Sequence, residues 1–236
     1  DQRDLHSFPT RRSSDLEELS DCVESLNALW GGAIVIDPHT AEILAITNVP
    51  HFDPGKPSSV SPEFRRNRIV TDMVEPGSTF KIVTFIEALE SGTITEDDPV
   101  DCENGQYRIG RHTINDSHKL GIVPASEVLI HSSNIGAVKI ADMLGKRRLY
   151  ERARLMGFGT ITGLDVPDEA QGKLPNPKTW SNLTLPTVSF GHGVSVTPIQ
   201  IAMSYASVAN GGMLLRPRLI KSIVGTDHRP GQDFET

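Results

Sequence analysis

The chain has 236 residues, 37% of them hydrophobic and 22% charged, which is the balance of a globular protein with a sizeable core. Its formal net charge of -7 at pH 7 disfavours nucleic acid as a partner, because phosphate backbones attract cationic surfaces. The pairs Arg65-Arg66 and Arg147-Arg148 are short, and we expect them on solvated faces.

The first half of the chain is predicted to run from a helix through a β-hairpin and a Pro/Ser/Gly loop to a second helix, then through a polar stretch with short strands. These elements cover, in that order, residues 17–29, 33–47, 50–62, 78–89 and 93–121.

The second half is predicted to hold a broken helical region, a short helix, a stretch rich in Gly, Pro and Thr, a helix with Pro198 in its first turn, and a β-run containing Pro217. These cover residues 126–144 with the break at 132–136, then 146–156, 157–185, 197–209 and 214–224. Strands at both ends around a helical middle predict the α+β class.

The N-terminal segment stands apart from this pattern. Residues 7–16, SFPTRRSSDL, read like an in-frame translation of a sequencing adapter, and a basic N-terminal arm is the alternative. We therefore predict that residues 1–16 are not native and that they make few packed contacts, as we also expect for residues 228–236. We expect the native fold to lie within residues 17–236.

The other bulk features point to no special chemistry. Cys22 and Cys102 permit a disulfide without implying one. Neither lies in a metal-binding spacing, and the eight histidines form no His-Glu-x-x-His pattern, so we expect no metal and no other cofactor. No apolar run approaches the length of a membrane span, and the N-terminus lacks the layout of a signal peptide.

The segment Glu75-Pro76-Gly77-Ser78-Thr79-Phe80-Lys81 places a serine and a lysine about one turn apart at the start of a helix. A hydroxyl with an amine in reach is the pair that serine acyl-transfer enzymes use when no histidine is present. Taken alone the pair is weak, because roughly one Ser-x-x-Lys is expected by chance in a chain this long. The alternative is a capping serine beside a solvated lysine.

A second motif, His131-Ser132-Ser133-Asn134-Ile135-Gly136, follows about fifty residues later. Ser-x-Asn is common by itself, and we interpret its other copy, Ser25-Leu26-Asn27, as part of a surface helix. In this order and at this interval, however, the two motifs resemble the first two signatures of penicillin-binding transpeptidases and serine β-lactamases.

Further stretches resemble class B penicillin-binding proteins, which are peptidoglycan D,D-transpeptidases. They are residues 32–46, Phe52-Asp53-Pro54, Arg66-Asn67-Arg68, residues 189–200 (SFGHGVSVTPIQ) and Ala209-Asn210-Gly211-Gly212. The resemblance runs from about Gly31 to Val224. It implies an antiparallel sheet flanked by helices with an inserted helical region. Residues 17–236 would then be a partial transpeptidase domain, truncated at the C-terminus.

The resemblance also implies roles for the motif residues. Ser78 would be the nucleophile that attacks stem peptides ending in D-Ala-D-Ala, and β-lactams would acylate it as mimics of that terminus. Lys81 would take its proton, which requires a pKa well below the ordinary value. Ser132 would relay a proton to the departing amine, and Asn134 would hold a substrate peptide group. Ser133 is interpreted as a spacer.

The third family signature, Lys-Thr/Ser-Gly on a strand, is absent. The only Lys-Thr pair, Lys178-Thr179, is followed by Trp180 and precedes the 189–200 stretch, whereas the family places the signature after it. We interpret the pair as a loop coincidence, because glycine is what lets a substrate backbone lie close to the strand. We predict that the chain stops before this strand, and that it labels slowly or not at all while its longer parent is an enzyme.

The resemblance further implies an N-terminal membrane anchor outside this chain and a location on the outer face of the bacterial cytoplasmic membrane. It makes divisome membrane proteins candidate partners, since Glu75 resembles the division or sporulation branch. Three alternatives stay open: a penicillin-sensing or divisome-scaffold domain without turnover, a serine β-lactamase, and a structural domain with coincidental motifs.

Overall fold

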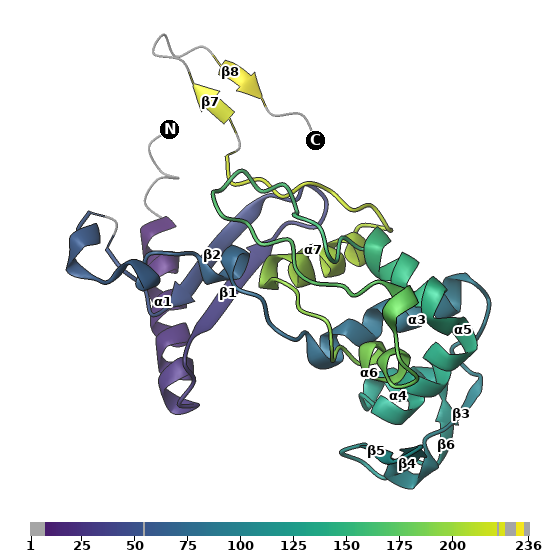
Figure 1. Ribbon diagram of the computed structural model, residues 1–236. Coiled ribbons are helices and arrows are strands. Elements are labelled where there is room, and N and C mark those ends of the chain that lie inside the picture. Colours follow the sequence, from purple (N-terminus) through teal and green to yellow (C-terminus); the bar gives the residue numbers. More distant parts are fainter. Residues whose placement is uncertain (1–7, 54, 221, 225–229, 234–236) are drawn as a thin grey trace. The chain divides into compact units, whose positions relative to one another are not determined.

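The computed structural model describes residues 8–53, 55–220, 222–224 and 230–233 (Figure 1). The chain divides into two compact units. Unit 1 comprises residues 1–72, 161–170 and 197–236, and unit 2 comprises residues 73–160 and 171–196. Unit 1 is therefore assembled from three separate segments of the chain.

Unit 1 contains the predicted β-hairpin, which the structure confirms. β1 (Gly31–Ile36) pairs antiparallel with β2 (Ile43–Val49), and the register shifts at a bulge near the end of β1. In the connecting turn, Asp37 Oδ1 accepts the backbone N–H groups of His39 at 2.8 Å and Thr40 at 3.2 Å. Aspartate favours turns for this reason, because its side chain bonds to the backbone just after it.

Among its described residues, unit 1 also contains the α-helices α1 (Phe8–Ser25), α2 (Arg68–Thr71) and α7 (Pro198–Ala209), and the short 3-10 helices η1 (Pro57–Ser59) and η2 (Pro62–Phe64). α7 begins with a capping box, in which the Thr197 and Gln200 side chains each accept the other residue's backbone N–H. The start of the predicted helix over 197–209 is thereby confirmed. The core of the unit is formed by buried side chains of α2, α7, the hairpin turn and the 161–170 segment: Ala41, Ile69, Val70, Leu164, Ile199 and Met203.

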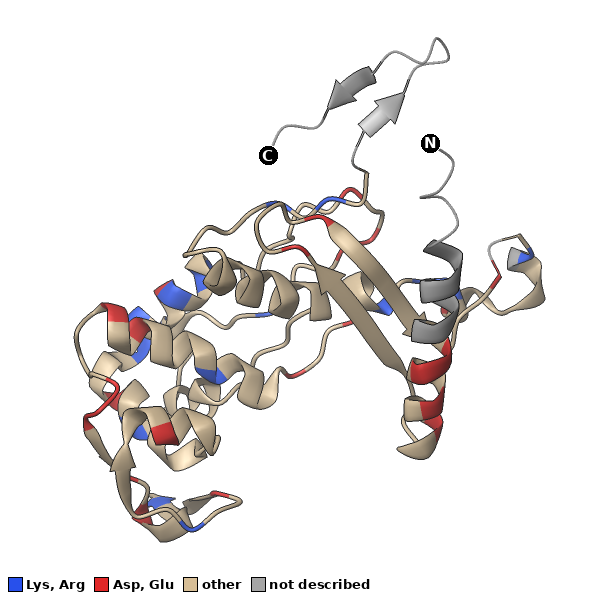
Figure 2. Ribbon diagram, turned by 180° about the vertical axis from the view of Figure 1, so that it is seen from behind, with Lys and Arg blue, Asp and Glu red and all other residues tan. Residues whose placement is uncertain are grey.

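α1 differs from the helix predicted over residues 17–29. It begins at Phe8 and ends at Ser25, and Asn27 then takes a positive φ of 48°, which is incompatible with continuing a right-handed helix. Figure 2 shows acidic positions, in red, along the described part of the α1 ribbon. Residues 1–7 and the side chains of 8–15 lie outside the described part, so the non-native character of residues 1–16 stays a prediction.

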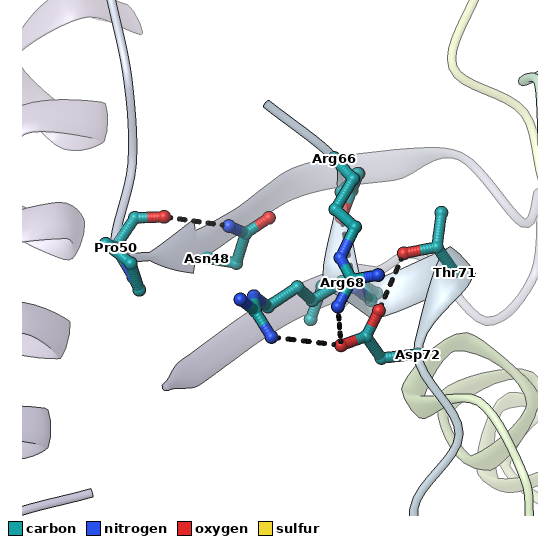
Figure 3. A network of polar contacts seen from close by, with 8 residues as sticks. Asn48, Pro50, Arg66, Arg68, Thr71 and Asp72 are labelled. Carbon is teal, nitrogen blue, oxygen red and sulfur yellow. Dashed lines mark hydrogen bonds and ion pairs between the residues drawn. The ribbon is translucent and has the colours of Figure 1, made fainter. Parts of the chain in front are cut away.

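The Arg66-Asn67-Arg68 motif builds a polar network in unit 1 (Figure 3). The Asn67 side chain caps α2 by accepting the N–H of Ile69 at 3.1 Å. The guanidinium groups of Arg66 and Arg68 each donate to Asp72 Oδ2 at 3.1 Å, and the Thr71 hydroxyl donates to the other carboxylate oxygen at 2.9 Å. These contacts give the motif a structural function.

The β-run predicted over residues 214–224 is largely wrong. Among the described residues of this range, only β7 (Ser222–Val224) is a strand, and it pairs with β8 (Pro230–Asp233). Upstream, Arg218 forms a single parallel bridge to Glu42. Pro217 lacks the N–H that a continuous ladder needs, which accounts for the short pairing. Of the C-terminal residues expected to pack little, 228, 229 and 234–236 lie outside the described part.

Unit 2 is mainly helical, and Figure 1 shows its helices gathered around α5. α5 (Asn134–Leu155) packs against α3 (Lys81–Glu90), α4 (Ala125–Ile130) and α6 (Thr184–Ser189). A kink at Gly145, with φ of 77°, divides α5 where the sequence predicted two helices. The buried core of this unit consists of Phe85, Ala88, Ile94, Val100, Cys102, Ala125, Val128, Ile140 and Leu144.

The polar stretch predicted over residues 93–121 does hold short strands. β3 (Pro99–Asp101) pairs with β6 (Ile122–Pro124), and β4 (Gln106–Ile109) pairs with β5 (His112–Asn115), both antiparallel. The named strands of the described residues therefore form antiparallel pairs beside helices, which confirms the α+β class.

Three features of the structure bear on the predictions from composition. Both cysteines are free, and Cys102 is buried while Cys22 is exposed. Across the residues that the structure describes, we find no helix with both the length and the apolar character needed to cross a membrane. The arginine pairs at 65–66 and 147–148 are exposed, as predicted.

Candidate active site

Ser78 lies in the short 3-10 helix η3 (Gly77–Phe80), which leads directly into α3. Pro76 precedes this turn, and Gly77 takes a φ of 56°, a conformation that glycine adopts without steric cost. Ser78 is exposed, while Phe80 beside it is buried against Phe158 with ring centroids 5.0 Å apart. The packing of Phe80 thus fixes the turn, and the Ser78 side chain is left exposed to solvent.

Lys81 is the first residue of α3, and its side chain is only 1% exposed. Its Nζ donates to Ser132 Oγ at 2.9 Å and also to the backbone carbonyl oxygen of Ser132. A buried ammonium without hydrogen-bond acceptors would be very costly, and these two oxygens provide them. The contact brings together residues 51 positions apart in the chain.

Burial lowers the pKa of Lys81 from its ordinary value of 10.5 to about 8, while the negative charge of Asp116 acts in the opposite direction. At pH 7 roughly one Lys81 amine in ten would be neutral, compared with fewer than one in a thousand for a free lysine. A neutral amine has a lone pair and can accept a proton.

Ser132, Ser133 and Asn134 occupy the break between α4 and α5. Ser132 has a positive φ of 55°, and Ser133 caps α5 by accepting the N–H of Gly136 at 2.9 Å. Ser133 is therefore more than the spacer that the sequence suggested. Asn134 Nδ2 donates to the carbonyl oxygen of Asn115 at 3.0 Å, which fixes the orientation of the side-chain amide.

The predicted site residues are brought together only in part. Lys81 and Ser132 are in direct contact, as expected, and Asn134 lies two residues beyond Ser132. Among the described hydrogen bonds, none joins the Ser78 hydroxyl to Lys81 or Ser132. Ser78 sits one turn before Lys81, so its contact with the amine stays a prediction.

The stretch 189–196 lies along the segment that carries Ser78. Val74 and Val196 exchange backbone hydrogen bonds of 2.8 and 2.9 Å, and Gly77 N–H donates to the carbonyl oxygen of Gly191 at 3.3 Å. A Cβ atom on residue 191 would lie 2.1 Å from the carbonyl oxygen of Gly77, so only glycine fits where the two segments cross. The Glu75 carboxylate accepts the N–H of Gly193 at 2.9 Å.

Lys178 and Thr179 lie in the 3-10 helix η5 (Pro177–Thr179), and both are exposed. Thr179 donates its hydroxyl hydrogen to the carbonyl oxygen of Asn176 at 2.8 Å. The pair is thus part of a turn and does not lie on a strand, which agrees with its interpretation as a loop coincidence.

Asp116 is the residue of this region that sequence reasoning missed. It follows β5, and its carboxylate accepts hydrogen bonds from Ser133, Asn134 and Ile135. In the sequence, Asn115-Asp116 gives only a turn signal, and no local pattern connects it to the later Ser-x-Asn motif.

Comparison with known proteins agrees with this geometry. The family model for the penicillin binding protein transpeptidase domain matches residues 31–235. A probable peptidoglycan D,D-transpeptidase, PbpC of Pseudomonas aeruginosa, is 36% identical over 203 residues, which cover 86% of this chain and 36% of that protein. Peptidoglycan D,D-transpeptidase FtsI of Escherichia coli is 34% identical over 206 residues, covering 87% and 34%.

Solved structures are similar as well. Penicillin-binding protein 3 of Mycobacterium tuberculosis, complexed with aztreonam, superposes with a TM-score of 0.85 at 29% identity, covering 94% of this chain and 50% of that one. The transpeptidase domain of penicillin-binding protein 3 from Burkholderia pseudomallei gives 0.79 at 30% identity, covering 93% and 61%.

The fold and the match over most of the chain define a transpeptidase domain of the β-lactamase/transpeptidase type. The chain belongs to the penicillin-binding-protein transpeptidase domain family, as the sequence motifs indicated. It spans between about a third and a half of the length of the curated relatives that it matches.

Proposed function

We propose that this chain is part of a penicillin-binding serine D,D-transpeptidase that cross-links peptidoglycan stem peptides through an acyl-enzyme on Ser78. The observation that carries the proposal is the buried Lys81 amine, which has a pKa near 8 and a hydrogen bond to Ser132, one turn after an exposed serine. An activated hydroxyl next to a neutral amine is what nucleophilic catalysis without histidine requires.

In the proposed reaction, Lys81 accepts the Ser78 proton while Ser78 Oγ attacks the carbonyl carbon of the penultimate D-alanine. The tetrahedral intermediate collapses, the peptide bond to the terminal D-alanine breaks, and Ser132 passes a proton from Lys81 to the departing amine. An amine from a neighbouring stem then attacks the ester carbonyl, Lys81 takes the proton of that amine and returns it to Ser78 Oγ, and the ester bond breaks, which releases Ser78 and forms the cross-link.

Asn134 serves binding in this scheme. Its Nδ2 already donates to the Asn115 carbonyl oxygen at 3.0 Å, so the amide oxygen is the group that would accept a substrate N–H. This role concerns positioning of the substrate and leaves the nucleophile and the base unaffected.

The experiment is covalent labelling with penicillin, followed by mass spectrometry, on the longer parent protein that includes the Lys-Thr-Gly strand. We expect one adduct on Ser78, which Ser78→Ala abolishes and Lys81→Ala nearly abolishes, while Asn134→Ala weakens labelling less. Ser117→Ala, a change of an exposed serine in the same unit, is the matched control and should label normally. The present chain alone should label slowly or not at all.

The outcomes also separate the alternatives. An adduct on another serine, or undiminished labelling of Ser78→Ala, would overturn the assignment of the nucleophile. Rapid loss of the adduct with hydrolysed penicillin would indicate a β-lactamase. Stable labelling without any cross-linking of stem peptides by the parent protein would indicate a penicillin-sensing or scaffold domain.

We also propose that the parent protein is membrane-anchored, acts on the outer face of the cytoplasmic membrane in cell division, and has divisome membrane proteins as partners. Support comes from its proposed substrate, which lies outside that membrane, and from the relative named FtsI. Protease added to intact spheroplasts should digest this domain of the parent protein, and full protection would contradict the location.

A further inference from the structure

Asp116 joins the loop after β5 to the start of α5. One carboxylate oxygen accepts the backbone N–H groups of Asn134 at 2.6 Å and Ile135 at 3.1 Å, and the other accepts the Ser133 hydroxyl hydrogen at 2.5 Å. The first N–H groups of a helix have no partner within the helix, so a carboxylate at this place satisfies them and also complements the helix dipole.

These bonds fix a backbone segment that would otherwise be unfavourable. Ser132 has a positive φ of 55°. This conformation costs a non-glycine residue free energy and persists only where surrounding contacts maintain it. Lys81 holds Ser132 through two hydrogen bonds. Asp116 holds the next two residues, Ser133 and Asn134.

Asp116 is also the carboxylate whose charge acts on Lys81, raising the pKa of the amine against the effect of burial. The other charged groups nearby are engaged elsewhere. Lys139 of α5 pairs with Glu103 at 2.7 Å and Asp101 at 3.7 Å. Burial raises the pKa of the Cys102 thiol, which keeps that group neutral.

We propose that Asp116 is a positioning residue of the candidate active site. It anchors the Ser132–Asn134 segment against Lys81, and its negative charge stabilises the Lys81 ammonium that forms when the amine takes the proton of Ser78. The inference rests on the proposed function and deepens it, because it assigns the geometry and the charge balance of the base to a residue outside the family motifs.

The test compares three substitutions. Asp116→Asn keeps the shape and one acceptor oxygen but removes the charge. Ser133→Ala keeps the charge but removes the hydroxyl that donates to Asp116 and caps α5. Asp37→Asn is the matched control, since Asp37 also accepts two backbone N–H groups in a turn, in unit 1.

The first measurement is the titration of Lys81 by carbon-13 NMR in lysine-labelled protein, with Lys81→Met used to assign the signal. The wild-type midpoint should be about 8. Asp116→Asn should lower it by roughly one unit, because an opposite charge favours the protonated amine. Ser133→Ala and Asp37→Asn should leave it in place.

The second measurement is the rate of Ser78 acylation by a fluorescent penicillin against pH in the parent protein. Asp116→Asn should move the acid limb of the profile to lower pH, because the pKa of Lys81 is lower without the negative charge. It should also reduce the maximal acylation rate, the plateau of the profile, about tenfold, because the Ser132–Asn134 segment is held less firmly. Ser133→Ala should reduce the plateau without moving the limb. Should Asp116→Asn fail to fold, Asp116→Glu, which displaces the charge by one methylene, should reduce the plateau.

A Lys81 midpoint that is unchanged in Asp116→Asn would overturn the proposal, whatever happens at Ser78. A wild-type acylation rate in Asp116→Glu would likewise overturn the positioning role. If the wild-type parent is never acylated, the proposed function fails, while the NMR comparison still decides whether Asp116 sets the charge balance of Lys81.

Discussion

Lys81 combines a titratable amine with nearly complete removal from water. Its pKa is about 8 in the folded protein, compared with the ordinary value of 10.5 that the unfolded chain is expected to have. Between these two pH values the folded state binds fewer protons than the unfolded state, so stability rises with pH there. Below the folded pKa, the cost of the buried charge is fully present.

We predict that the stability penalty of Lys81, about 3 kcal/mol at pH 7, is relieved as pH rises from 8 to 10.5. Lys81→Met removes the titrating group, so the difference in unfolding free energy between this variant and wild type should change by about 3 kcal/mol in favour of wild type across that window. Urea unfolding at a series of pH values measures it. Lys178→Met, at an exposed lysine of η5, is the control variant, and equal slopes for both variants would contradict the prediction.

Gly191 controls the crossing of the 189–196 stretch over the Ser78 turn. We predict that Gly191→Ala lowers stability by roughly 2–4 kcal/mol and slows acylation of Ser78, because the new Cβ would lie 2.1 Å from the Gly77 carbonyl oxygen. Gly110→Ala is the control, since Gly110 also has a positive φ but has open space around its Cβ position. Thermal unfolding and penicillin labelling measure both, and equal losses would show that backbone strain alone accounts for the effect.

At the residue scale, sequence reasoning found the residues that lie in compact motifs. Ser78 with Lys81, and Ser132 with Asn134, are each recognisable within a few positions. Asp116 could not be found in this way, because the groups it binds lie 17 to 19 residues further along the chain. Only folding of the β4–β5 hairpin against α5 brings them together.

Helices and strands were predictable where local signals agreed. α3 and α7 have apolar periodicity and clear boundaries, and the prediction succeeded. α6 was missed, because it has six residues with Pro186 in its middle. The break predicted at residues 132–136 ends earlier, because Ser133 is the cap of α5 and the following residues are its first turn.

The contact between α4 and α5 depends on a glycine of the second motif. A Cβ atom on Gly136 would lie 2.3 Å from a methyl carbon of Val128, a fully buried residue of α4. This close approach gives a physical reason for glycine in Ser-Ser-Asn-x-Gly, where the helical backbone alone would favour alanine.

We predict that Gly136→Ala destabilises the protein by about 1–3 kcal/mol through overpacking. Val128→Ala alone should also destabilise it, since it leaves a cavity. The double variant should lose clearly less than the sum of the two, because alanine at 136 fills part of the space. Denaturant unfolding of all four proteins forms a double-mutant cycle, and simple additivity would show that the two side chains do not compete for space.

The whole molecule was predicted as one partial domain over residues 17–236, and that boundary stays a prediction. The family model matches residues 31–235, so both compact units belong to the same family domain. Sequence reasoning did not anticipate the division into units. Unit 1 draws its core from residues near 41, 70, 164 and 200, and such pairing of distant segments leaves no local signal.

The three-segment composition of unit 1 has a consequence for synthesis on the ribosome. Unit 2 ends at residue 196, whereas unit 1 still needs α7 and Arg218, whose carbonyl oxygen accepts the Ile43 N–H at 2.9 Å. We therefore expect residues 17–72 of the nascent chain to remain unfolded, with their apolar side chains exposed, until residues 197–236 have been synthesised. In a chain released after residue 196, we expect protease to digest residues 17–72 and to spare residues 73–160 and 171–196 of unit 2, and equal protection of both units would show that unit 1 folds without its late segment.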